Sequence, residues 1–179
     1  MIYSFGFDRI GVVVGDLYFV DPRPAKGQEG PEHGVRLELR VLERGELRGS
    51  IYSAQPIVIG QPIWRVDLLE STAGRPGSFD RTHCHPVFSG WDPGSRVFIR
   101  ELSADPIGWL GRKLSDLPGL LKEAGVSADI AGDEDAAGVR EAVPEICDVT
   151  QKLLVRVRSG ELGQAPGGPP ADSARVGWL

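Results

Sequence analysis

The chain has 179 residues, of which 41% are hydrophobic and 25% charged, and its formal net charge is −5. This composition is typical of a globular protein with enough apolar material to form a core without disulfide or metal staples. The negative charge argues against a general nucleic-acid binder, which needs a basic surface to displace counterions from phosphates.

The first part of the chain favours β-strands. Residues 10–20 are rich in β-branched and aromatic side chains, and Gly15-Asp16 predicts a turn that divides them into two short strands. Residues 21–34 are dominated by Pro and Gly and predict a long loop with His33 near its end. Residues 35–42 then alternate between apolar and charged side chains, which indicates a half-buried strand.

Further strands are expected up to residue 101. A tight turn at residues 43–46 predicts a hairpin with residues 47–53, and short strands are expected at residues 56–59 and 95–101. Between them, residues 63–70 form a strand in which Trp64, Val66 and Leu68 share one face. Arg65 and Asp67 lie on the opposite face, because successive side chains of a strand alternate.

Helices are expected after residue 102. Asp105 followed by Pro106 is typical of a helix start, and helical sequence continues to Lys122 with a break near residues 117–119. A second helix is predicted at residues 133–142, and Pro144 is expected to open a third at residues 145–157.

Strands first and helices later predict an α+β fold. We expect a mainly antiparallel sheet or partial barrel over residues 9–101, followed by two to three C-terminal helices. Residues 1–158 would form a single domain, β-rich over 1–102 and helical over 103–158. Residues 159–179 read as a flexible Gly/Pro-rich tail, whose apolar end at residues 176–179 could bind the body or a partner.

The pattern with the clearest chemistry is His83-Cys84-His85, which contains two of the three histidines of the chain. An extended backbone is favoured because Pro86 follows directly. Alternation then puts both imidazoles on one face and the thiol of Cys84 on the other. Two imidazoles placed in this way can bind one divalent metal ion, zinc or iron.

The sequence offers several candidates for the other ligands of such a site. His33 is a candidate third ligand, since the loop before it could fold over the sheet. Asp80, Asp92 and Asp67 are candidate carboxylates, whereas alternation places Glu70 on the wrong face. Asp80 and Asp92 are also the candidate catalytic residues, because either could orient a histidine that acts as a general acid or base.

The spacing around the pair resembles the first half of the cupin metal motif. Pro76-Gly77 is followed, after five residues, by His83 and His85. Beyond the pair the resemblance ends, because Ser89 and Gly90 stand where the motif has Glu and no further histidine follows. The resemblance therefore covers about ten residues and implies metal-binding spacing rather than membership of the family.

Two functions remain open. The first is a metal-dependent hydrolase, isomerase or lyase that acts on a small polar molecule through His83 and His85. The second is a non-enzymatic interaction protein of the immunity, inhibitor or adaptor type, in which the histidines are structural and a protein partner binds the sheet edge or the Trp178-Leu179 end.

The expected compartment is the cytoplasm. The N-terminus lacks the pattern of a signal peptide, no apolar run is long enough to span a membrane, and two cysteines do not make a disulfide framework. We therefore expect neither a membrane partner nor a nucleic-acid partner.

Overall fold

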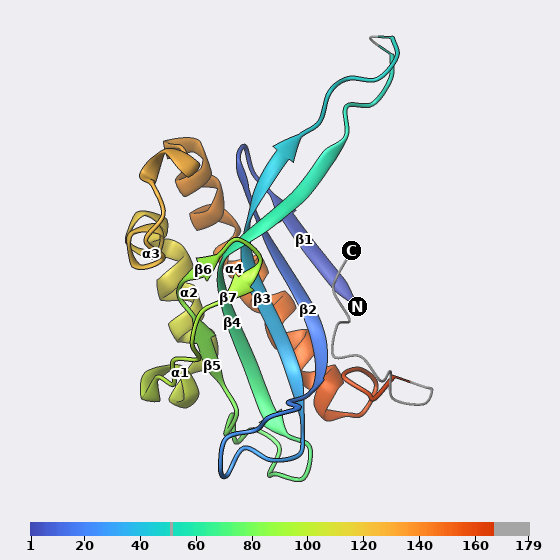
Figure 1. Ribbon diagram of the computed structural model, residues 1–179, viewed down its shortest axis with the longest axis vertical. Helices are drawn as coiled ribbons and strands as arrows, with labels where there is room; N and C mark the ends of the chain where they lie inside the picture. The colour runs from blue at the N-terminus through green and yellow to red at the C-terminus, as the bar shows by residue number, and fades with distance from the viewer. Residues whose placement is uncertain (51, 167–179) are drawn as a thin grey trace.

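The computed structural model describes residues 1–50 and 52–166. Its centre is an antiparallel sheet of five strands that pair in chain order (Figure 1). The strands are β1 (Ile2–Gly6), β2 (Ile10–Val20), β3 (Pro31–Arg44), β4 (Ile57–Ser71) and β5 (His83–His85). A separate small hairpin is formed by β6 (Phe88–Ser89) and β7 (Asp92–Pro93).

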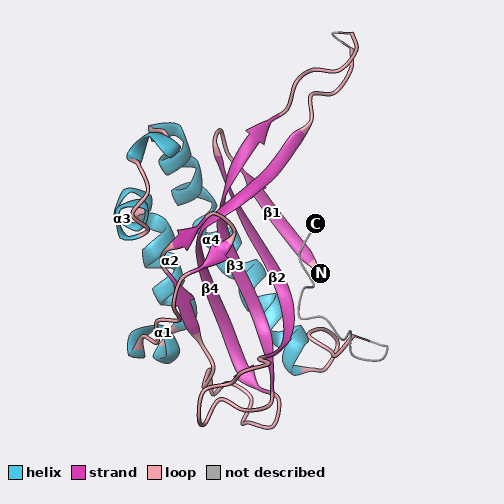
Figure 2. Ribbon diagram, viewed as in Figure 1, coloured by secondary structure: helices cyan, strands magenta, loops and turns pink. Residues whose placement is uncertain are grey.

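The helices follow the strands and pack on one face of the sheet (Figure 2). They are α1 (Arg100–Ala104), α2 (Pro106–Ser115), α3 (Leu117–Glu123) and α4 (Asp133–Arg158), with a 3-10 turn at Ala128–Ile130. The longest helix, α4, contacts β1, β2 and β3 and also packs against α2. The expected α+β class is confirmed, although the described residues contain four α-helices rather than two to three.

The apolar core lies between the sheet and these helices. The alternation of side chains along each strand supplies it: Val14, Leu37 and Val66 stand next to one another on β2, β3 and β4 and are fully buried. Trp109 of α2 stacks on Trp64 of β4 with a centroid distance of 6.0 Å. Strand and helix residues therefore share one continuous core.

The strands are longer than the sequence signals indicated. No turn divides β2 at Gly15-Asp16, because both residues pair continuously with β3. β4 likewise runs through Gly60 and Pro62, where we expected a break. The register between β3 and β4 shifts at Arg40, which indicates a β-bulge rather than the end of the strand. Cross-strand pairing overrides local turn preference at both places. The sheet also gains β1, which the sequence did not reveal.

The strand expected at residues 95–101 does not form. Among the described residues this segment makes a single isolated bridge, between Cys84 and Val97, and α1 begins at Arg100. The helix start at Asp105 and Pro106 is confirmed, since the Asp105 side chain accepts a hydrogen bond from the amide of Gly108.

The two helices expected on either side of Pro144 are one helix, α4. A proline inside a helix costs about 3 kcal/mol, because it removes one backbone hydrogen bond and crowds the preceding turn. The buried stripe continues across it, with Val139 before Pro144 and Ile146, Val149 and Leu153 after it. Burial of this stripe outweighs the cost of the proline.

β3 and β4 extend beyond the rest of the sheet as a two-stranded arm, which projects at the top of Figure 1. The tight turn expected at residues 43–46 is absent, because Arg44 still pairs with Ile57 and the connection runs through residues 45–56. The side chains of Ile57, Val58 and Ile59 on this arm are exposed.

The segment after α4 remains attached at first. Leu162 is half-buried and packs against the core, and the amide of Gly163 donates a hydrogen bond to Asp16. Residues 159–166 of the predicted tail are described, whereas its remainder, with the apolar end at residues 176–179, lies outside the described residues. In the part of the chain that is described, none of the helices is long and apolar enough to cross a bilayer.

Candidate metal centre

The second face of the sheet carries charged side chains in register across three strands. Arg36 on β3 pairs with Asp67 on β4, which in turn pairs with His83 on β5. One step along the strands, Glu38 stands opposite Arg65, and Arg65 stands opposite His85. Directly paired residues point to the same side of a sheet, so these side chains form two parallel rows of ionisable groups. Each row ends at a histidine of β5.

This polar face is not open to solvent. The arginine side chains of Arg40 and Arg65 lie under the rings of Trp91 and Phe88, in cation–π contacts of 5.2 and 5.1 Å. The loop between β2 and β3 covers another part, where Arg96 binds Asp21 at 3.1 Å. The polar face is therefore buried beneath the segments that flank β5, and its charges must be satisfied within the protein.

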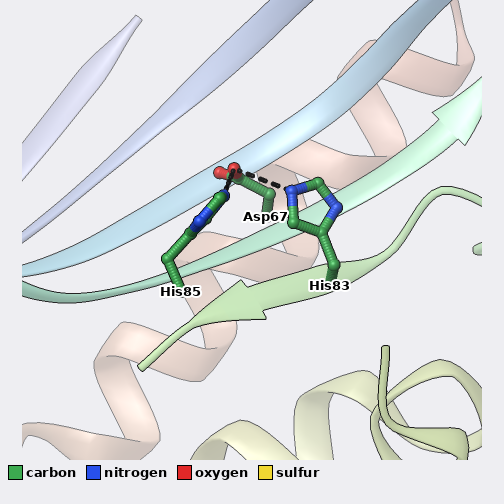
Figure 3. Close-up of side chains that lie close together, drawn as sticks. All are labelled: Asp67, His83 and His85. Carbon is green, nitrogen blue, oxygen red and sulfur yellow. Dashed lines mark ion pairs between the residues drawn. The ribbon is translucent and has the colours of Figure 1, made fainter. Parts of the chain in front are cut away.

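Two histidines and one carboxylate converge in the middle of this face (Figure 3). The Nε2 atom of His83 lies 3.5 Å from Oδ2 of Asp67, and Nε2 of His85 lies 3.8 Å from the same oxygen. One ligand atom from each residue falls within 4.8 Å of the other two. The side chains are almost fully buried, with exposed fractions of 2% for His83 and Asp67 and 9% for His85.

The hydrogen bonds of the two rings fix their tautomers. Nδ1 of His83 lies 2.8 Å from the carbonyl oxygen of Arg81, and Nδ1 of His85 lies 2.7 Å from that of Gly94. A carbonyl oxygen only accepts, so both Nδ1 atoms carry the proton. In a neutral ring Nε2 is then an acceptor, and both Nε2 lone pairs point toward Asp67.

Both rings are neutral near pH 7. Burial lowers the pKa of His83 to about 4, although the charge of Asp67 acts in the opposite direction. Burial also lowers the pKa of His85. Three acceptor atoms therefore meet with no proton among them, an arrangement that a cation would relieve. A fixed tautomer with Nδ1–H bound to a carbonyl is also the usual arrangement of a metal-ligating histidine.

Asp67 is held in its charged form by Arg36. Nε of Arg36 donates to Oδ1 at 2.7 Å, and NH2 donates to Oδ2 at 3.0 Å. Burial alone would raise the pKa of Asp67, but this two-pronged ion pair outweighs burial and holds the pKa below its ordinary value. The carboxylate is thus ionised and fixed in orientation, as a metal ligand requires.

The separations suit a small divalent ion. Tetrahedral zinc with bonds of about 2.0–2.1 Å keeps its ligand atoms roughly 3.3 Å apart. The two Nε2–Oδ2 distances of 3.5 and 3.8 Å exceed that value only slightly. Two histidines and one carboxylate also form the ligand set of many non-haem iron(II) sites. The buried cluster could hold either metal.

The structure separates the other predicted site residues from this cluster. His33 stands opposite Glu70 in the β3–β4 pair. Glu70 binds Arg158 of α4, so both residues lie toward the helix face rather than the polar face. Asp80 accepts hydrogen bonds from the amide of Ser71 and the hydroxyl of Ser78. Asp92 is exposed in β7. The third ligand atom comes instead from Asp67.

A second buried carboxylate lies on the same face near the loop between β2 and β3. Glu32 is 1% exposed, and neither of its carboxylate oxygens has a hydrogen-bond partner among the described residues. Nε of Arg81 and NH1 of Arg96 each lie 3.9 Å from its Oε1 atom. Burial raises the pKa of Glu32 despite these two cations.

Cys84 occupies the opposite face, as alternation predicted, and is fully buried in the core. Burial raises the pKa of its thiol to about 11. Such a thiol is protonated at neutral pH and is a poor nucleophile, and its place on the opposite face of the sheet keeps it away from the cluster.

Two cavities of about 310 Å³ each lie away from the cluster, one between α2 and α3 and the other between β1 and the base of the arm.

Comparison of the chain with models of protein families, with curated protein sequences and with solved structures returns no match. What the site does must therefore follow from its own geometry.

Proposed function

We propose that this protein binds one divalent transition-metal ion, zinc or iron(II), through Nε2 of His83, Nε2 of His85 and a carboxylate oxygen of Asp67. The observation that carries the proposal is the convergence of three buried acceptor atoms around one point, with both histidine tautomers fixed by backbone carbonyls. A structural role for the histidines would leave these acceptors facing one another, which is costly away from water.

We further propose that the ion acts on a small polar molecule. Three protein ligands leave at least one coordination position free, as in catalytic rather than structural zinc sites. An ion at this position polarises a bound oxygen and lowers the pKa of bound water, which serves hydrolysis, isomerisation or elimination.

The test is metal content. Untagged protein is purified and its bound zinc, iron, manganese, nickel and copper are measured by mass spectrometry, before and after addition of zinc or iron(II). We expect close to one ion per chain in the wild type and a loss of the ion in the His83→Ala/His85→Ala variant. His33→Ala provides the matched control, because it removes the third histidine of the chain but lies away from the cluster.

Protein that stays metal-free after addition of zinc or iron(II) would reject this function. So would metal that is retained by the double variant. The non-enzymatic interaction protein would then be the better hypothesis. The exposed residues Ile57, Val58 and Ile59 of the arm would be the first surface to mutate.

A further inference from the structure

The polar face is electrically balanced without a metal ion. Ion pairs on this face join five cations to five anions. The cations are Arg36, Arg40, Arg65, Arg81 and Arg96, and the anions are Asp21, Glu32, Glu38, Asp67 and Asp80. Asp67, the one carboxylate in the cluster, is already neutralised by Arg36. A divalent ion would therefore add two positive charges that no described side chain of this face compensates.

Such an excess is unfavourable at a buried site. Charges in a medium of low dielectric constant interact strongly and are tolerated only when they are paired. Most of the groups involved are shielded from solvent, since Glu38 and Arg65 are exposed by 11% and 13%. Protonation of Glu32, which burial favours, would increase the positive excess further.

The positive charges lie on the side of the imidazoles. Arg65 is the direct cross-strand neighbour of His85, on the same face. Arg36 lies in the row of His83, since Arg36 pairs with Asp67 and Asp67 pairs with His83. A ligand that approaches the two Nε2 atoms therefore has the guanidinium groups of Arg65 and Arg36 on the same face of the sheet.

We infer that the metal ion held by His83, His85 and Asp67 takes a small oxyanion, a carboxylate or a phosphate, as its further ligand, and that Arg65 helps to hold it. This inference rests on the proposed function. Guanidinium groups favour oxyanions because their donors match the geometry of carboxylate and phosphate oxygens.

The size of the oxyanion is limited by the surrounding rings. Phe98 lies 5.5 Å from His83 and Phe88 lies 6.5 Å from His85, as centroid distances. Of the three ligands, His85 is the most exposed, at 9%. The oxyanion that binds is therefore small and approaches from the side of His85.

The experiment uses the full-length chain loaded with Co²⁺, whose visible absorption reports changes in its ligands. Acetate and inorganic phosphate are titrated separately at fixed pH, and a pH titration without either anion reports hydroxide. We expect a saturable spectral change with at least one of the two anions, and the stronger of the two responses identifies the oxyanion class.

Arg65→Met should weaken the affinity for that anion by about tenfold or more, because it removes one positive charge near the ligand, while Co²⁺ affinity changes little. Folding should tolerate the change, since Glu38 keeps its ion pair with Arg40 at 3.1 Å. Arg44→Met is the control, because Arg44 lies on the arm and pairs with Asp8.

Three outcomes would overturn the inference. A spectrum that shows bound Co²⁺ but no response to either anion rejects it while the proposed function stands. A spectrum that responds only to pH assigns the position to hydroxide. A chain that binds no Co²⁺, zinc or iron(II) rejects both the inference and the proposed function.

Discussion

The two faces of the sheet are both buried, yet they are built on different principles. Adjacent residues of β3 belong to different faces: Leu37 belongs to the apolar core, whereas Arg36 and Glu38 belong to the polar face. The apolar face is stabilised by area removed from water, which is non-directional. The polar face depends on specific pairs, each with a defined geometry.

This difference supports the proposal that the polar face serves a function. A buried ion pair is seldom more stabilising than apolar residues of the same shape, because desolvation offsets the attraction. The α+β fold could be built with a simpler second face, left open to water as in many antiparallel sheets. A covered face with paired charges and two neutral histidines therefore points to a task beyond folding.

The largest effect is expected when one partner of a buried pair is removed. Asp67→Ala leaves Arg36 without its carboxylate and should destabilise the metal-free protein by about 3–5 kcal/mol. The double variant Arg36→Met/Asp67→Leu should recover much of this loss, because no uncompensated charge remains. Urea unfolding in the presence of a chelator measures both. Equal losses in the single and double variants would contradict the pairing.

On the apolar face the corresponding change acts through volume. Leu37→Ala removes a fully buried side chain between β2 and β4 and should cost about 3 kcal/mol. Unlike the loss of stability in Asp67→Ala, the loss of stability in Leu37→Ala should not depend on a second substitution on the polar face. Urea unfolding of Leu37→Ala, alone and combined with Arg36→Met/Asp67→Leu, tests whether the two effects add.

The sequence predicted the contrast between the two faces, but it predicted only part of the site. Alternation over residues 35–41 and 64–68 predicted which side chains share a face, and it placed Cys84 opposite the two histidines. These inferences are local, because side chains of a strand alternate wherever the strand pairs.

The strand pairing that brings the site residues together is not local in sequence. Asp67 meets His83 because of the register between β4 and β5, which depends on the path of residues 72–82. The sequence favoured His33, Asp80 and Asp92 as the residues that complete the site and offered Asp67 only as one further carboxylate, and strand register distinguishes them. The sequence suggested that the loop before His33 could fold over the sheet, but alternation alone did not reveal that Arg36 and Arg65 lie in a covered face.

Metal should raise stability through the polar face alone. At a free zinc concentration 100-fold above its Kd, the ion should stabilise the wild type by about 2.7 kcal/mol, because it binds the folded state only. His83→Ala/His85→Ala should lose this gain, whereas His33→Ala should keep it. Urea unfolding with zinc and with chelator gives the difference for each variant. A gain that persists in the double variant would place the ion elsewhere.

The smallest effect tests how far burial extends along a single strand. Ile63 and Ile57 both belong to β4, but Ile63 is 2% exposed in the core and Ile57 is 70% exposed on the arm. Ile63→Val should cost about 1 kcal/mol, since it removes a buried methylene and leaves a small void. Ile57→Val should leave the free energy of unfolding unchanged within about 0.5 kcal/mol. A comparable loss at Ile57 would mean that the arm is covered in solution, and its exposed isoleucines would then belong to an interface.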